Sequence, residues 1–77
     1  MKTYKLTETE EKFAELIWTN EPIGSGDLVK LCEKEMDWKK STMYTVLKKL
    51  CGKGIFQNED AMVSSLITKD EYYAKQS

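Results

Sequence analysis

Apolar residues recur at helical spacing through the first two thirds of the chain, and the period changes after Gly54. Three segments carry apolar residues three or four positions apart, the spacing of a helix that buries one face. These helices are expected at about residues 8–19, 26–35 and 40–51. Two later segments, 55–57 and 62–67, are short apolar runs on either side of a polar turn at 58–61, which indicates a β-hairpin.

Residues that begin and end helices lie where this pattern requires them. Thr7–Glu10 and Thr68–Glu71 each place a glutamate three residues after a threonine, the arrangement of a capping box. Ser25 is the expected N-cap of the second helix, because its hydroxyl can accept from an unbonded amide. Gly52 and Gly54 can adopt the left-handed backbone that ends the third helix.

Three helices followed by a hairpin are typical of a winged helix-turn-helix, in which the third helix enters the major groove and the hairpin is the wing. We therefore expect a mainly α fold with a small β-hairpin and a two-stranded wing. Ile23 could add one short bridge to a later strand. The DNA-binding domain is expected at residues 1–67, and residues 68–77 are expected to begin a C-terminal dimerisation helix of a longer protein.

The charge of the chain is unevenly distributed, although 12 basic and 13 acidic residues leave a formal net charge of −1. Between residues 38 and 54 every charged residue is a lysine, whereas the segments before and after contain more acids than lysines. A domain of this kind can turn one face to phosphate and another to solvent. Because the sequence contains no arginine, bidentate guanidinium readout of guanine is excluded.

The expected third helix combines this charge with hydroxyl groups. At about 100° per residue, Ser41, Thr45 and Lys48 point away from the apolar face. Hydroxyls can bond to phosphates or base edges, lysines can neutralise phosphates, and a tyrosine ring can contact a thymine methyl. The predicted DNA-binding residues are Lys39, Lys40, Ser41, Thr42, Tyr44, Thr45, Lys48 and Lys49. The alternative is a plain amphipathic helix whose lysines serve solubility.

Other classes of function find little support among the residue types present. The sequence has no histidine, no phosphate-cradling glycine loop and no nucleophile–base pair, so we expect neither enzyme activity nor a cofactor. Cys32 and Cys51 alone cannot complete a tetrahedral zinc site, so no metal is expected. Both are interpreted as reduced thiols of a cytoplasmic protein, and the alternative is a disulfide or a redox switch. No apolar run approaches the roughly 18 residues of a membrane span, so no membrane partner is expected.

Four segments carry a resemblance to a known family: Glu15–Trp18, Asp37–Leu50, Lys53–Phe56 and Glu71–Tyr73. In this order and spacing, over about residues 6–75, they resemble the penicillinase repressors of the BlaI and MecI type, which include copper-responsive relatives. The resemblance implies a transcriptional repressor with an N-terminal winged helix that binds DNA. It also implies a separate C-terminal domain that forms a homodimer on a palindromic operator.

The resemblance places the recognition surface on the third helix. The matching positions are Ser41, Thr42, Tyr44 and Thr45, with Lys48 beyond them. Glu59 and Asp60 make the wing turn acidic, so we expect the wing to contribute little to DNA contact. The isolated domain is expected to be a monomer that binds DNA weakly. The alternative function is a winged-helix protein–protein interaction module, in which the same helix docks an acidic partner.

Overall fold

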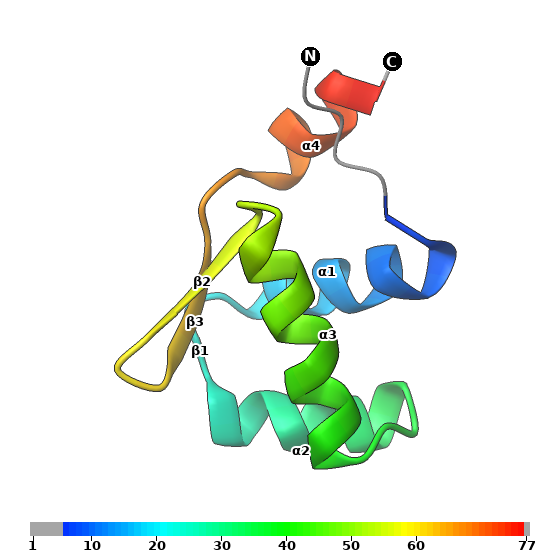
Figure 1. Cartoon of the computed structure of the whole chain (residues 1–77), viewed down its shortest axis with the longest axis vertical. Coiled ribbons are helices and arrows are strands. Elements are labelled where there is room, and N and C mark those ends of the chain that lie inside the picture. Colours follow the sequence, from blue (N-terminus) through cyan, green and yellow to red (C-terminus); the bar gives the residue numbers. More distant parts are fainter. Residues whose placement is uncertain (1–5, 77) are drawn as a thin grey trace.

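The computed structural model describes residues 6–76, so the outer limits of the two expected units, residues 1 and 77, lie outside the described part. These residues form four helices and three strands (Figure 1). In chain order the elements are α1 (Glu8–Asn20), β1 (Ile23–Gly24), α2 (Ser25–Glu35), α3 (Lys40–Gly52), β2 (Phe56–Glu59), β3 (Met62–Ser65) and α4 (Lys69–Gln76). The predicted order of three helices, a hairpin and a further helix is confirmed.

The three strands form one antiparallel sheet in the order β1-β3-β2. Ile23 pairs with Val63, which confirms the expected bridge and adds a third strand to the two-stranded wing. The predicted four-residue turn at 58–61 is wrong, because β2 runs to Glu59 and pairs there with Met62. The turn consists of Asp60 and Ala61 alone.

Backbone geometry explains how so short a turn closes the hairpin. Asp60 and Ala61 have φ values of 53° and 62°. Positive φ at both central residues gives a turn whose twist matches the twist of the two strands. At the other end, the amides of Leu66 and Ile67 both donate to the carbonyl of Ile55, at 2.7 and 3.4 Å. The chain therefore leaves the sheet after Ser65, and the prediction that this strand reaches residue 67 is wrong.

The capping residues predicted at the helix N-termini are confirmed with one exception. The side chains of Thr7 and Thr68 each accept from the amide three residues later, and the glutamates there accept in return, so both capping boxes are confirmed. Ser25 is not an N-cap: Gly24 occupies that position without a side-chain bond. The reason is tertiary, because the Ser25 amide donates to Ala61 O in the wing at 2.8 Å. The wing carbonyl thus replaces a capping hydroxyl.

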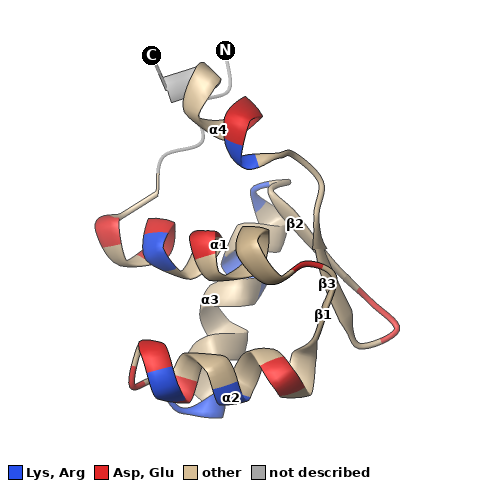
Figure 2. Cartoon of the chain, turned by 180° about the vertical axis from the view of Figure 1, so that it is seen from behind, with Lys and Arg blue, Asp and Glu red and all other residues tan. Residues whose placement is uncertain are grey.

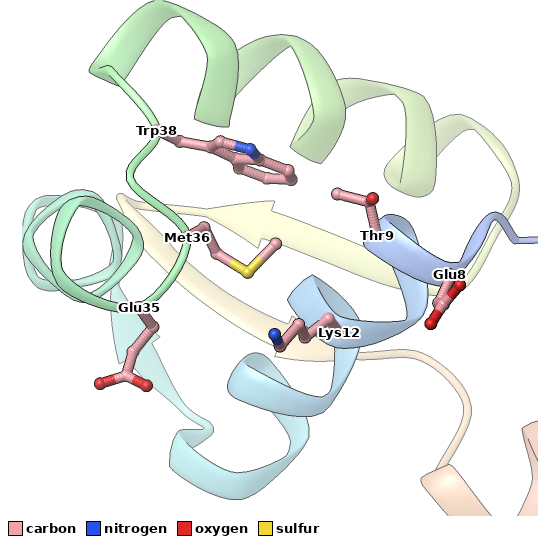
Figure 3. A pocket seen from close by; sticks show the side chains of 6 residues that line it. All are labelled: Glu8, Thr9, Lys12, Glu35, Met36 and Trp38. Atoms are coloured by element: carbon pink, nitrogen blue, oxygen red, sulfur yellow. The ribbon is translucent and has the colours of Figure 1, made fainter.

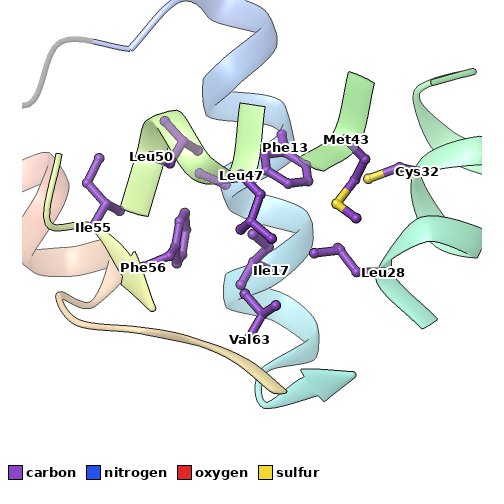
Figure 4. Close-up of a cluster of buried hydrophobic side chains, with 11 residues drawn as sticks. Phe13, Ile17, Leu28, Cys32, Met43, Leu47, Leu50, Ile55, Phe56 and Val63 are labelled. Atoms are coloured by element: carbon purple, nitrogen blue, oxygen red, sulfur yellow. The ribbon is translucent and has the colours of Figure 1, made fainter. Parts of the chain in front are cut away.

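A single core joins the helices to one face of the sheet (Figure 4). Its members are buried apolar side chains from α1, α2, α3, the turn before β2 and the two wing strands: Phe13, Ala14, Ile17, Leu28, Cys32, Met43, Leu47, Leu50, Ile55, Phe56 and Val63. At the end of α3, Gly54 has a φ of 81° and its amide donates to Cys51 O, while Ile55 N donates to Leu50 O. This left-handed C-terminal turn leads the chain directly from α3 into the core at Ile55.

Helix α4 packs against α1 through aromatic rings. Tyr72 is 1% exposed, its ring centroid lies 5.5 Å from that of Trp18, and its hydroxyl donates to Glu11 Oε2 at 2.9 Å. The indole nitrogen of Trp18 donates to Ile67 O at 3.1 Å. Lys69 Nζ lies 2.9 Å from Glu15 Oε1. The start of α4 is therefore fixed on the face of α1 that is remote from α2.

Candidate nucleic-acid interface

Helix α3 lies across the front of the molecule, with the hairpin beside it and α1 and α2 behind it (Figure 1). Met43, Leu47 and Leu50 are buried and attach one side of this helix to the core. The opposite side is therefore left to solvent over the whole length of the helix. Its solvent-exposed positions are Lys40, Ser41, Thr42, Thr45, Lys48, Lys49 and Gly52, with Lys39 at the N-cap.

The predicted site residues thus share one surface, but they differ in how exposed they are and in which flank of α3 they occupy. Tyr44 is half-buried and packs against the core with part of its ring. At 100° per residue, Tyr44 and Lys48 lie on the flank of α3 nearer to β2, whereas Thr42 and Lys49 lie on the flank nearer to α1. Ser41 and Thr45 lie between these flanks. The hydroxyls therefore occupy the crest of the helix, and one lysine lies on each side of it.

The two crest hydroxyls are not chemically equivalent. Thr45 Oγ1 donates to Ser41 O at 2.8 Å, so its proton is used within the helix. Its oxygen lone pairs remain free to accept, which suits the amino group of adenine or cytosine in the major groove. A phosphate oxygen can only accept a hydrogen bond, so it would need the hydroxyl proton that Thr45 already donates to Ser41 O. The hydroxyl of Ser41 is exposed and can rotate to either role.

The two lysines near the end of α3 also differ. Lys49 Nζ lies 3.8 Å from Glu10 Oε2 of α1, although the lysine side chain is 64% exposed. Within the described part of the chain, Lys48 has no carboxylate within ion-pair distance. Lys48 therefore presents the more available positive charge, while that of Lys49 is partly offset by α1.

A hollow of about 380 Å³ separates α3 from β2, and sequence reasoning missed it. Its lining consists of Tyr44, Leu47, Lys48, Cys51 and Asn58. The amide of Asn58 enters this surface from the wing. Alternation along β2 could have indicated this, because Asn58 is two residues after the buried Phe56 and pairs with the buried Val63. Its side chain therefore points to the α3 side of the hairpin.

Acidic residues lie on α1, on α2 and at the tip of the hairpin, and one of them, Glu10, lies beside Lys49 of α3. Figure 2, seen from behind, shows acidic positions along α1 and α2 and at the tip of the hairpin. Glu59 and Asp60 are both exposed at this tip. The lysines of α3 consequently lie between an acidic rear surface and an acidic wing tip. An approaching polyanion would be favoured on α3 and disfavoured at either side.

A second hollow, of about 420 Å³, lies between the start of α1 and the end of α2 (Figure 3). Its lining mixes charges of both signs with two apolar side chains: Glu8, Thr9, Lys12, Glu35, Met36 and Trp38. Among residues 6–76, no group of three or more histidine, cysteine or acidic side chains is arranged to bind a metal ion. Nor does that range contain a helix with the length and hydrophobicity needed to cross a bilayer.

Cys51 is one of the residues that line the hollow beside α3. It is half-buried, Cys32 is fully buried, and both are free thiols. Burial raises the pKa of each, and that of Cys32 reaches about 11. Both sulfurs are therefore protonated at neutral pH, and Cys51 presents a small, weakly polar surface.

Comparisons with known proteins give relatives of this chain in sequence and in structure. A curated relative, an uncharacterized 16.5 kDa protein of Latilactobacillus sakei, is 30% identical over 57 residues. The match covers 74% of this chain but 39% of the relative, so the chain spans about two fifths of that protein's length. The solution structure of Bacillus licheniformis BlaI, in its monomeric form with the blaP half-operator, has a TM-score of 0.75 at 23% identity and covers 92% of both chains. The model of the penicillinase repressor family matches residues 6–77, and the chain belongs to this family.

Proposed function

We propose that the chain is the DNA-binding domain of a transcriptional repressor, and that α3 reads a duplex operator from the major groove. The family assignment and the fold shared with BlaI support this function. The observation that carries it is the surface of α3. This surface has hydroxyls on the crest and lysines on the flanks, while the apolar side of the helix packs in the core.

The dimensions of α3 and of B-DNA support this docking mode. A helix with side chains is about 10–12 Å across, and the major groove is about 12 Å wide. With the crest inserted, Ser41 and Thr45 meet base edges while both flanks meet the phosphate rails. Lys39, the N-cap, and Lys40, the first residue of α3, extend the positive surface toward the same rails. Phosphate contacts then set the register, and the crest supplies the sequence preference.

The longer protein is proposed to act as a pair of such domains on a palindromic operator. A symmetric dimer matches a two-fold related pair of half-sites. The BlaI structure, of a monomeric form on a half-operator, supports the idea that one domain serves one half-site. The isolated 77-residue chain is then a monomer, and it binds more weakly because the tethered second domain is missing. Analytical ultracentrifugation with and without a two-site duplex tests this stoichiometry.

A salt titration tests DNA binding itself. The chain first selects duplexes from a randomised pool, and its affinity for a selected duplex is then measured at several salt concentrations. Neutralising three or four phosphates predicts a slope of log K against log salt between about −2.7 and −3.6. Lys12→Ala on α1 is the matched control, because it removes a lysine that lies away from α3. A slope near zero would refute the proposal.

The alternative, a protein-interaction module, draws on one observation, the exposed acids at the wing tip. The same titration separates the two functions. Amide chemical shifts of α3 that move with duplex DNA support the repressor. If these chemical shifts do not change when duplex DNA is added at low salt, the repressor function is ruled out and the interaction module is favoured.

A further inference from the structure

The hollow between α3 and β2 has the composition of a site for one sugar–phosphate unit. Of the residues that line it, the buried Leu47 and the half-buried Cys51 and Tyr44 are taken as its floor, and the exposed Lys48 and Asn58 as its rim. Its volume of about 380 Å³ lies in the range of small-ligand sites. Deoxyribose presents C–H groups, which match the apolar floor of the hollow. The adjoining phosphate presents anionic oxygens, which match the polar residues of its rim.

The position of the hollow determines which part of a duplex can reach it. A helix that fills the major groove meets base edges with its crest and a backbone rail with each flank. On the α1 flank, Lys49 Nζ lies 3.8 Å from Glu10 Oε2, so a carboxylate is already present beside this lysine. On the wing flank, Lys48 and Asn58 converge from two elements. The wing flank therefore offers a backbone rail a hollow lined by polar side chains from two elements, with no carboxylate among its lining residues.

We propose that this hollow binds one backbone sugar–phosphate of the operator, with Asn58 and Lys48 on the phosphate and Tyr44 and Cys51 against the sugar. This proposal rests on the DNA-binding function proposed above and assigns to it two further residues, Asn58 and Cys51. The wing then contributes through the α3-facing side of β2, not through its tip. Beyond Asn58 the exposed acids Glu59 and Asp60 repel the next phosphate, which confines the contact to a single unit.

Substitutions on the two faces of β2 test the proposal. Asn58→Ala removes the amide, and we expect about a tenfold loss of affinity for a selected duplex, as for a lost hydrogen bond to a charged group. Asn58→Asp places a carboxylate against the phosphate and should weaken binding further. Gln57→Ala is the matched control, because Gln57 bonds to Ser64 on the opposite face of the same strand. Its affinity should equal that of the parent chain.

Salt dependence distinguishes the two polar groups. Asn58 is neutral, so Asn58→Ala should leave the salt slope unchanged. Lys48→Ala should reduce the magnitude of the slope by about 0.9, the value for one phosphate. Urea unfolding of each variant identifies any loss of affinity that arises from loss of the fold.

Cys51 supplies an independent readout of occupancy. The parent chain is treated with methyl methanethiosulfonate, with and without a saturating selected duplex, and modification of each cysteine is followed by mass spectrometry. DNA should protect Cys51 several-fold more than Cys32, which is buried in the core and reports only general stabilisation.

The outcomes separate this inference from the proposed function. Loss of affinity in Asn58→Ala together with selective protection of Cys51 supports the site. Parent-like affinity in Asn58→Ala, or equal protection of the two cysteines, overturns the site even if Lys48→Ala still weakens binding. In that case α3 binds DNA without the hollow. A parent chain that selects no duplex from the pool overturns both proposals.

Discussion

The carboxylate oxygen Oε1 of Glu21 accepts two hydrogen bonds from Ser65, one from the backbone amide at 2.8 Å and one from the hydroxyl at 2.7 Å. Glu21 directly follows α1, and Ser65 is the last residue of β3. Because β1 pairs with β3 through only two residues, this side chain extends a very short pairing. Glu21 therefore ties the base of the wing to the end of α1.

Removing this carboxylate should destabilise the domain. Glu21→Ala leaves the half-buried amide of Ser65 without its acceptor, and we expect the free energy of unfolding to fall by about 1–3 kcal/mol. Glu21→Gln keeps an oxygen acceptor and should lose less. Urea unfolding followed by circular dichroism measures both, with the exposed Glu33→Ala as control. An Ala variant as stable as the parent would contradict the role given to Glu21.

The buried phenol of Tyr72 should make stability depend on alkaline pH. Burial, and next the hydrogen bond to Glu11, raise the pKa of Tyr72 above its ordinary value of about 10. The folded chain thus retains a proton that the unfolded chain releases. Stability is fully present below about pH 10 and is lost as the pH rises above it. Tyr72→Phe should reduce this alkaline loss, while lowering stability at neutral pH by about 1 kcal/mol through the missing hydrogen bond.

Urea unfolding at neutral pH and at about pH 11 measures this effect. Burial also raises the pKa of the more exposed Tyr73, so Tyr73→Phe is the matched control and should change the alkaline loss less. An alkaline loss of stability that is the same in Tyr72→Phe and the parent would disprove the assignment.

The two neighbouring lysines of α3 should contribute unequally to DNA binding. Lys48 lines the hollow between α3 and β2, whereas Lys49 Nζ lies 3.8 Å from Glu10 Oε2. Lys48→Ala should therefore weaken binding more than Lys49→Ala, because part of the Lys49 charge is already compensated. Parallel titrations at one salt concentration compare them. If Lys49→Ala has the larger effect, the α1 flank meets the backbone more closely than proposed.

The wing turn should tolerate glycine better than alanine. Ala61 has a φ of 62°, and a side chain in this left-handed region costs about 1 kcal/mol. Ala61→Gly removes that cost, partly offset by the greater freedom of the unfolded chain. We expect a net gain of at most about 0.5 kcal/mol in the free energy of unfolding. Ala61→Ser retains Cβ and should give no gain. A destabilised glycine variant would contradict the strain at this position.

The thiols should react in a fixed order. The raised pKa values of Cys32 and Cys51 keep the reactive thiolate scarce at neutral pH, so alkylation by iodoacetamide should be slow in the folded chain. Cys51 is half-exposed and should react before the buried Cys32. Peptide mass spectrometry over time establishes the order, and urea should make the two rates similar. Faster modification of Cys32 in the folded chain would be inconsistent with its burial.

Local patterns were sufficient to predict most of the elements. The stripe containing Met43, Val46, Leu47 and Leu50 is a property of spacing alone, and it determined both that α3 is a helix and which side is buried. Both capping boxes depend on residues three apart, so they too are visible without a fold. The orientation of Ser41 and Thr45 toward solvent follows from the same periodicity.

Contacts between distant residues decided the rest. Ser25 looks like a capping residue, but its amide is bound by the wing carbonyl of Ala61. The length of the wing turn depends on the register in which Glu59 meets Met62. Spacing along one helix could not separate Lys48 from Lys49, because the difference comes from Glu10 of α1.

The hollow beside α3 illustrates the same division. Its helical residues could be placed on one flank of α3 from the sequence, but Asn58 joins them only because β2 packs beside that flank. The sequence by itself determined the elements, the buried faces and a basic third helix, since these depend on local spacing and charge. The tertiary structure alone decided which charges are compensated, which hydroxyl and amide groups are bound, and where two elements form a site. These depend on distances between residues far apart in the chain.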